Sequence, residues 1–349
     1  MKNKYKCPTC KSSNTVRRGK RNGKLRFFCK DCSSWFQINR GKKSYDVDIL
    51  ISHLDGTSFR KLSDQYSLSV GNVYNKAYSI ASNLPHCADI TREYCNRYSG
   101  ILLCDGKYVK VKGYDRKIPF IYGIDYTTHD IPTYKLVRSE SYLAWLKFFE
   151  SLKLMNYPLR MLVSDDNENI RLACNYVYPN AHFQLCHNHY KENIRRILQV
   201  RSNEIHKEFM SRINELFSFK RSLDDFNRYS KNILNDFNHN QIYVSILVDI
   251  YKRRNVLLGY LNVKGTPNTN NLIESFNSHF ESRLRAMRGF DSFKHADLWI
   301  NALIVRRRFK DFTDCKRKFK HLNGKSSIQK TKNKNVVIPT FSKLLSAKK

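Results

Sequence analysis

Long hydrophobic runs are absent from this sequence. No stretch approaches the roughly 18 consecutive apolar residues of a membrane span. The first ten residues, MKNKYKCPTC, lack the apolar core of a secretory signal. We therefore expect a cytoplasmic protein with no membrane partner. Apolar residues still make up 41% of the chain, which excludes a largely disordered protein and predicts a globular fold.

Acidic residues are also scarce. The 349 residues include 30 Asp and Glu against 63 Lys and Arg, for a net charge of +33. Phosphate backbones attract clustered Lys and Arg, and the release of counterions drives binding. The charge therefore predicts a nucleic-acid partner. A solvated basic surface and an anionic membrane surface are the alternatives, and no basic amphipathic anchor helix supports the second.

Four of the ten cysteines have the spacing of a zinc site. They form the pattern C-x2-C-x18-C-x2-C, made by Cys7, Cys10, Cys29 and Cys32. In a reducing compartment such pairs indicate metal ligands and not disulfides. Two thiolate pairs separated by a short hairpin can close a tetrahedral site, and four thiolates leave no open position. We predict a zinc ribbon over residues 1–43 with structural Zn²⁺, in a segment that carries fourteen Lys or Arg and one acid.

Residues 44–84 have the pattern of a helix-turn-helix domain. Helices are expected at 47–54, 57–66 and 70–84, with Thr57 or Ser58 and then Ser69 as N-caps. The second helix of such a motif enters the major groove of DNA. The side chains expected to contact DNA lie early on the third helix: Val70, Asn72, Asn75 and Lys76. Any small three-helix domain is the alternative.

Residues 85–97 are expected to be a linker, and a strand-rich region follows. Strands are expected at 100–113, 118–128, 130–140, 160–166 and 181–186, with helices at 141–155 and 168–178. The order β-β-β-α-β-α-β is the ribonuclease H-like arrangement, a mixed sheet with helices on its faces. The fold class expected is multidomain α/β, with a catalytic core over 98–312. An all-α insertion is expected at 187–262, and a poorly ordered basic tail at 313–349.

Three acids occupy positions where a core disfavours charge. Asp105 lies within the first core strand, Asp165 ends the fourth, and Glu274 lies on the helix after the insertion. The first and fourth strands of the expected sheet are neighbours, so the two aspartates would lie side by side. Converging carboxylates repel unless divalent cations lie between them, and oxygen ligands suit Mg²⁺ or Mn²⁺. Asp125 and Asp166 are the rival acids, and surface charges are the alternative.

Longer motifs surround these acids: "CDG" at 104–106, "VSDDNENI" at 163–170, "YPNAHFQLCHNHYKENI" at 178–194 and "TPNTNNLIESFNSHFESRLR" at 266–285. With them, the sequence resembles a DDE transposase of the bacterial insertion-sequence kind, within the Mutator-like superfamily. The resemblance covers about residues 100–310. Asp105, Asp165 and Glu274 fall on the family's catalytic positions. Asp166 stands where the family often has glycine, so either aspartate could be the metal ligand.

The resemblance implies metal-dependent DNA cleavage followed by strand transfer, with two Mg²⁺ or Mn²⁺ ions at the catalytic site. It implies double-stranded DNA partners, the transposon ends and target DNA, and at least a homodimer to synapse two ends. It also implies a prokaryotic, nucleoid-associated protein. A catalytically inactive DNA-binding regulator and a nuclease without strand transfer are the alternatives.

Several further residues belong to the expected site. The family motif C-x2-H corresponds to Cys186 and His189, which the resemblance places near the active site; a core cysteine and a capping histidine are the alternative. A zinc half-site that adds His187 lacks enough ligands. Asn277 is expected near the site. Arg283, Arg285 and Arg288 could hold the DNA backbone, or form an ordinary charged helix face.

Overall fold

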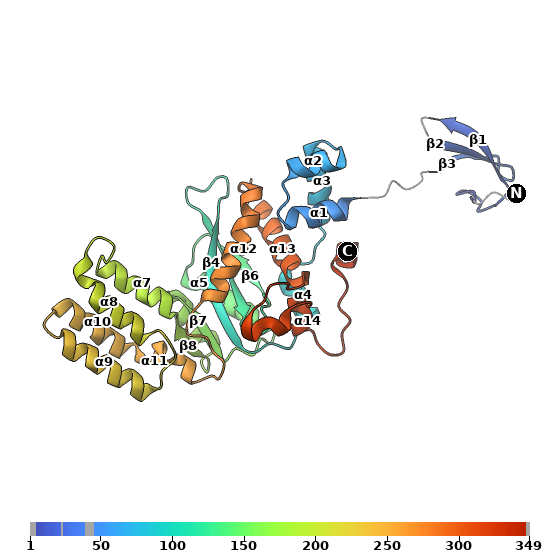
Figure 1. Cartoon of the computed structure of the whole chain (residues 1–349). Helices are drawn as coiled ribbons and strands as arrows, with labels where there is room; N and C mark the ends of the chain where they lie inside the picture. The colour runs from blue at the N-terminus through green and yellow to red at the C-terminus, as the bar shows by residue number, and fades with distance from the viewer. Residues whose placement is uncertain (1–4, 22–23, 39–44, 347–349) are drawn as a thin grey trace. The chain divides into compact units, whose positions relative to one another are not determined.

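The computed structural model describes residues 5–21, 24–38 and 45–346 (Figure 1). The chain forms two compact units, Met1–Asp48 and Ile49–Lys349. It is a mixed α/β protein, as the sequence predicts. None of the helices in the described part of the chain has the length and apolar character needed to cross a bilayer.

The first unit contains a three-stranded antiparallel sheet. Its strands, in spatial order, are β1 (Thr15–Arg21), β2 (Lys24–Cys29) and β3 (Trp35–Ile38). Side chains alternate along the central strand, so Phe27 is buried and stacks on Phe36 with 5.7 Å between ring centroids. Thr15 pairs with Cys29. The sheet thereby brings the second cysteine pair beside the segment that follows the first pair.

Three short helices begin the second part of the chain: α1 (Asp46–Leu54), α2 (Phe59–Tyr66) and α3 (Val70–Ala81). The predicted N-caps are confirmed. The Ser58 hydroxyl accepts a hydrogen bond from Lys61 N, and the Ser69 hydroxyl accepts one from Asn72 N. Each cap satisfies a backbone donor that the first helical turn leaves without a partner.

A five-stranded mixed sheet carries the first two of the three acids singled out in the sequence. Its order is β6-β5-β4-β7-β8. The bounds are β4 (Ile101–Val109), β5 (Ile118–Asp125), β6 (Tyr134–Leu136), β7 (Met161–Ser164) and β8 (His182–Leu185). β4 is antiparallel to β5 and parallel to β7. The expected neighbourhood of the first and fourth core strands is therefore confirmed.

Helices cover both faces of this sheet. On one face, α5 (Tyr142–Leu154) and α6 (Glu168–Val177) bury Trp145 and Ile170 against Leu102 of β4. On the other face, α12 (Asn271–Met287) packs Phe280 edge-on against Tyr122 of β5. Because side chains alternate along β4, Leu102 and Cys104 point to the first face and Asp105 to the second.

A helical segment lies between β8 and α12, and Figure 1 shows its helices gathered at one end of the sheet. It consists of α7 (His187–Ile197), η1 (Glu204–His206), α8 (Lys207–Leu216), α9 (Leu223–Phe237), α10 (Gln241–Lys252), α11 (Arg254–Leu257) and η2 (Gly259–Leu261). These helices bury a hydrophobic cluster of their own, with Phe209 and Tyr243 stacked at 4.0 Å between ring centroids. The cluster also includes Leu185 of β8, so the helical segment packs against this edge of the sheet.

Two expectations about irregular segments are wrong. The expected linker contains α4 (Cys87–Tyr94), which buries Cys87 and Ile90. The C-terminal region, expected to be poorly ordered, contains η3 (Arg317–Leu322), α14 (Ser327–Thr331) and α15 (Phe341–Ser346). Its basic residues remain on the surface, while a few apolar side chains such as Ile328 enter the core.

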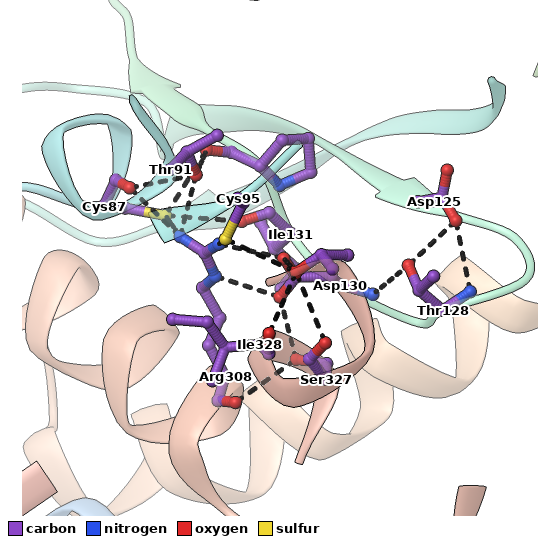
Figure 2. Close-up of polar contacts among 12 residues, drawn as sticks. Cys87, Thr91, Cys95, Asp125, Thr128, Asp130, Ile131, Arg308, Ser327 and Ile328 are labelled. Carbon is purple, nitrogen blue, oxygen red and sulfur yellow. Dashed lines mark hydrogen bonds and ion pairs between the residues drawn. The ribbon is translucent and has the colours of Figure 1, made fainter. Parts of the chain in front are cut away.

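A buried ion pair connects these overlooked helices to the core. Arg308, near the end of α13 (Phe293–Phe309), pairs with Asp130 at 2.8 Å, and neither side chain is exposed. Figure 2 shows the guanidinium of Arg308 between Asp130 and the helix that carries Thr91. The hydroxyl groups of Ser327 and Thr331 also donate to Asp130. One aspartate thus holds α13 and α14 together, and its Arg308 partner reaches α4.

Candidate active site

Asp105 lies on β4 and is held by the neighbouring strand and helix. Its carboxylate accepts a hydrogen bond from Gly106 N at 2.8 Å and another from Asn277 Nδ2 of α12 at 2.7 Å. The Asn277 side-chain oxygen accepts a hydrogen bond from the buried Tyr122 hydroxyl at 2.8 Å. Tyr122 stands opposite Asp105 on β5. The chain Tyr122–Asn277–Asp105 therefore fixes the carboxylate relative to α12.

Asp165 follows β7 at the level of Asp105. Leu103 pairs with Val163 in the parallel ladder, and each aspartate lies two residues beyond its member of that pair. Burial raises the pKa of Asp105 to about 6; the bond from Gly106 opposes this shift, and the charge of Asp165 adds to it. Burial also raises the pKa of Asp165, while the nearby His189 lowers it. Two partly buried carboxyl groups are thus close enough to raise each other's cost of ionisation, and the positive charge of His189 compensates only part of this cost.

The two rival aspartates have other partners. Both carboxylate oxygens of Asp166 contact Nη1 of Arg253, at 2.6 and 2.7 Å, in the helical segment. Asp125 is fully buried on β5, where its carboxylate accepts five hydrogen bonds, from Ser99, Thr128 and Tyr157. Figure 2 includes the contact between Asp125 and Thr128. Both acids therefore have structural partners that account for their charge.

Glu274 lies in the first turn of α12 beside the start of α7. The Nε2 atom of His189 is 3.8 Å from Oε1 of Glu274. Ligand atoms of Cys186, His189 and Glu274 all lie within 4.8 Å of one another. The nearby Cys186 side chain raises the pKa of His189 to about 9, with burial opposing this shift and the Cys186, Glu274 and Asp165 charges adding to it. His189 thus contributes positive charge between Glu274 and Asp165.

His187 is not available as a further metal ligand. Its Nε2 lies 2.7 Å from the backbone oxygen of Leu257, which can only accept, so this nitrogen carries the proton. The other nitrogen, Nδ1, faces the Asn268 amide at 3.3 Å. The third member of the cluster around Cys186 is instead Glu274, which is distant in sequence. Spacing patterns that consider only residues close in sequence therefore do not predict Glu274 as a member of this cluster.

A further acid, Glu140, was missed by the sequence analysis; its carboxylate lies against Gly106 of β4, on the face of the sheet that α5 covers. It precedes α5, and its charge contributes to the raised pKa of Asp105. The signal in the sequence was Gly106, since a glycine inside a strand often marks the close approach of another group. Nothing in the sequence identified which residue approaches.

The four cysteines of the first unit converge as their spacing predicts. Their sulfur atoms lie within 4.8 Å of one another, with Cys7 Sγ 3.6 Å from Cys32 Sγ and Cys10 Sγ 3.5 Å from Cys29 Sγ. A tetrahedral zinc ion with Zn–S bonds of about 2.3 Å needs sulfurs about 3.8 Å apart. This cluster can therefore bind zinc with little rearrangement.

Comparison with known proteins identifies the family. A sequence model described as "Transposase, Mutator family" matches residues 38–308, which is most of the chain. The chain belongs to this family. The transposase for insertion sequence element IS1201 of Lactobacillus helveticus is 21% identical over 254 residues, which span 70% of this chain and 68% of the relative. The protein is therefore a DNA transposase of the insertion-sequence kind.

One solved structure also resembles this transposase at a distance. The Drosophila P element transposase strand transfer complex covers 80% of this chain and 95% of its own, with 10% identity. The TM-score is 0.47.

The transposase exposes part of the surface predicted to contact DNA. On α3, Val70, Asn72 and Asn75 are exposed, whereas Lys76 is half-buried. The opposite side of the helix packs on α13, where the Tyr74 hydroxyl lies 3.1 Å from His295 Nε2. The side of α3 that carries Val70, Asn72 and Asn75 therefore faces solvent.

The three arginines predicted to hold DNA lie toward the end of α12, and they differ in their partners. Arg283 donates to the backbone oxygen of His279 and to the Ser282 hydroxyl of its own helix. Arg285 approaches Glu281 at 3.6 Å but is 79% exposed, and Arg288 ends the helix in a left-handed conformation. A surface pair such as the one Arg285 forms is weak, so that guanidinium can turn to phosphate.

Proposed function

We propose that this transposase cleaves and joins DNA through Asp105, Asp165 and Glu274 in a ribonuclease H-like core over residues 98–312, with residues 187–262 as an insertion. The observation that carries the proposal is the parallel pairing of β4 with β7, which places the two aspartates at one level. Asn277 joins Asp105 to α12, one turn beyond Glu274. The acids thus belong to rigid elements, as a reaction centre requires.

The acids suit divalent metal ions. Asp105 and Asp165 are partly buried oxygen donors, and their pKa values are raised first by burial and further by neighbouring carboxylates. We infer that these two residues, with Glu274, hold Mg²⁺ or Mn²⁺, which prefer oxygen ligands. When bound, such ions supply Lewis acidity at the scissile phosphate. Asn277 orients the Asp105 carboxylate, and His189 orients Glu274 and offers positive charge to DNA.

The assignment of Asp165 in preference to Asp166 is part of the proposal. Asp166 is neutralised by Arg253, whereas Asp165 faces Asp105 and His189. Cys186 accepts a hydrogen bond from Asn270 N at 3.2 Å, so it fixes the start of α12 near Glu274. We assign Cys186 and His189 a positioning role and no metal.

We propose that the zinc ribbon, residues 1–43, and the helix-turn-helix, residues 44–84, bind the element ends. The exposed polar residues of α3 and the basic charge of the chain support this role. Synapsis of two ends requires at least a dimer on DNA. The basic residues of the C-terminal region, residues 313–349, would then contact DNA phosphates.

The test is cleavage of a labelled duplex that carries the terminal sequence of the element. The purified full-length protein is incubated with Mg²⁺ beside Asp105→Asn. We expect cleavage that leaves a 3′-hydroxyl at the element boundary, and its loss in the variant. Tight binding without cleavage by either protein, in Mg²⁺ and in Mn²⁺, would instead indicate a DNA-binding regulator.

A second arm separates a transposase reaction from simple cleavage. Precleaved ends are mixed with a supercoiled target plasmid, and joined products are detected by gel electrophoresis. We expect joined products with the wild-type protein. Cleavage without any joining would indicate a ribonuclease H-like nuclease.

A further inference from the structure

A cavity of about 480 Å³ lies where α2 and α3 meet the ends of β4 and α12 and the first turns of α13. Its volume falls in the range of small-molecule sites, about 300–1,000 Å³. Four aromatic side chains line it: Phe59, Tyr74, Phe290 and Trp299. The Tyr74 hydroxyl and the Trp299 indole nitrogen lie 3.1 and 2.7 Å from Nε2 of His295, so these two rings are fixed. The cavity therefore suits a flat ring that stacks on aromatic side chains.

One residue that lines the cavity has an unpaired hydrogen-bond acceptor. His53 is 1% exposed, and its Nδ1 lies 2.9 Å from the backbone oxygen of Thr57. Because a carbonyl oxygen only accepts, Nδ1 carries the proton and Nε2 of the neutral ring is an acceptor. This Nε2 is buried and has no partner among the described residues. An unsatisfied buried acceptor is destabilising, so a ligand with an N–H group would be favoured here.

The rim of the cavity is basic. Lys110, Lys112 and Arg288 have exposed side chains that form no hydrogen bond or ion pair within the described parts of the chain. Asp291 is the one acid among the lining residues. Backbone hydrogen bonds fix this rim, since Phe290 N donates to the Lys110 carbonyl at 3.0 Å and Lys112 N donates to the Phe290 carbonyl at 2.8 Å. Unpaired cations beside an aromatic cavity are complementary to a phosphate joined to a base.

Both β4 and α12 run from the acids of the proposed active site to this cavity. At about 3.4 Å per residue, Lys110 lies about 17 Å beyond Asp105 along the direction of β4. At about 1.5 Å per residue, Arg288 lies about 21 Å beyond Glu274 along α12. These lengths correspond to about five or six base steps of a DNA strand, at about 3.4 Å each. A DNA strand bound at the acids can therefore reach the cavity.

The aromatic lining, the unpaired acceptor and the basic rim together favour a nucleotide. We propose that the cavity binds one unpaired nucleotide of the DNA that the transposase processes, with its base among the aromatic rings and its phosphate at Lys110, Lys112 and Arg288. An unpaired base has its N–H groups available for His53, whereas a paired base does not. The inference rests on the proposed function, because the acids place this nucleotide about five or six base steps from the site of cleavage.

The first test measures binding of the full-length protein to duplexes that carry the terminal sequence of the element. Each duplex lacks a single base, on one strand or the other, at a position about four to eight pairs from the cleavage site. Fluorescence anisotropy without divalent metal gives the affinities. At one base pair, we expect removal of one base to tighten binding about tenfold, because its partner no longer has to be unpaired. Removal of that partner should give no gain, because the base that enters the cavity is then missing.

Variants of the cavity wall then test where this gain arises. Ala286 lines the cavity near the end of α12, so Ala286→Phe fills the space and should abolish the gain. Leu154→Phe places the same ring at a position on α5 that is 80% exposed, and it should retain the gain. His53→Phe keeps an aromatic ring and removes the acceptor, so it should reduce the gain about threefold.

A variant of the rim avoids any change in the interior. Arg288→Ala removes an exposed side chain and should reduce the gain about threefold through loss of a phosphate contact. Lys147→Ala removes an exposed cation on α5 and should leave the gain unchanged. Thermal unfolding identifies any variant that fails to fold, and Arg288→Ala decides the question if Ala286→Phe does so.

Binding of dAMP alone distinguishes a DNA strand from a free nucleotide. Binding of dAMP that Ala286→Phe abolishes, without a strand difference in the duplexes, would assign the cavity to a free nucleotide and overturn the inference. No gain at any position, equal gains from removal of either base, or a full gain in folded Ala286→Phe would also overturn it. Cleavage by the wild type and its loss in Asp105→Asn would then leave the proposed function standing. A strand difference in a protein that does not cleave would overturn the catalytic proposal alone.

Discussion

The two adjacent aspartates after β7 illustrate how tertiary partners divide roles between identical residues. Asp165 faces Asp105, whereas Asp166 pairs with Arg253 at the surface. We predict that Asp165→Asn lowers cleavage of the element end at least about 100-fold through loss of a metal ligand. Asp166→Asn should change it less than about tenfold, since a half-exposed ion pair contributes about 1 kcal/mol or less.

Single-turnover cleavage of a labelled end measures both variants, and thermal unfolding verifies their folds. A larger loss in Asp166→Asn than in Asp165→Asn would reverse the assignment of the metal ligand.

The sequence indicated several candidate acids but could not rank them by their partners. An acid inside an apolar strand is conspicuous, so Asp105 and the rival Asp125 were both visible. What separates them is the five hydrogen bonds that the Asp125 carboxylate accepts, and these come from residues in three different segments. Glu140 was overlooked because it lies in a loop, where an acid is ordinary. Side-chain partners distant in sequence therefore decide the roles of these residues.

At the scale of elements, α1 is connected to α13 by a neutral histidine. His53 stacks on Phe59 at 3.7 Å and contacts the edge of Trp299 at 5.2 Å between ring centroids. Its Nδ1 donates to the Thr57 carbonyl at 2.9 Å, while its buried Nε2 has no partner. Burial lowers the pKa of His53 to about 4, and the bond to Thr57 opposes this shift.

This histidine should make the packing of α1 and α2 on α13 sensitive to acid. The unfolded chain binds the proton near pH 6.5 and the folded chain only near pH 4, so the free energy of unfolding falls as pH decreases between these values. The loss from His53 is at most about 3 kcal/mol. We predict a weaker pH dependence of unfolding in His53→Phe, which keeps the stacked ring.

Urea unfolding at pH 7 and pH 5, followed by circular dichroism, measures the difference. His182→Phe, a change at an exposed histidine, is the control and should retain the wild-type pH dependence. Equal pH dependence in His53→Phe and the wild type would contradict the assignment.

The elements that the sequence predicted are those with strong periodicity. Alternation and apolar runs identified the core strands, and hydroxyl N-caps marked α2 and α3. The missed helices, α4 and α14, have eight and five residues and contain cysteine, threonine and serine. Short helices of this composition are weak on propensity alone. They form because Arg308 and Asp130, 178 residues apart, bury a shared hydrogen-bond network between them.

At the scale of the whole molecule, the four-cysteine cluster that can bind zinc belongs to the first compact unit, and the acids proposed to bind Mg²⁺ or Mn²⁺ belong to the second. Four thiolates close the coordination of zinc, so the ribbon has no open position for chemistry. We predict one zinc per chain in the purified protein and its loss in Cys29→Ser, measured by atomic emission. Cys315→Ser, a cysteine outside the cluster, should retain zinc.

Loss of zinc should affect DNA binding and leave the second unit folded. The units have separate internal contacts, so thermal unfolding of the residues from Ile49 onward should be unchanged in Cys29→Ser. Affinity for the element end should fall at least about tenfold as the basic ribbon loses its shape, with a smaller salt dependence because fewer phosphates are neutralised. Unchanged affinity and salt dependence would show that the remaining charge, spread over the second unit, is sufficient for binding.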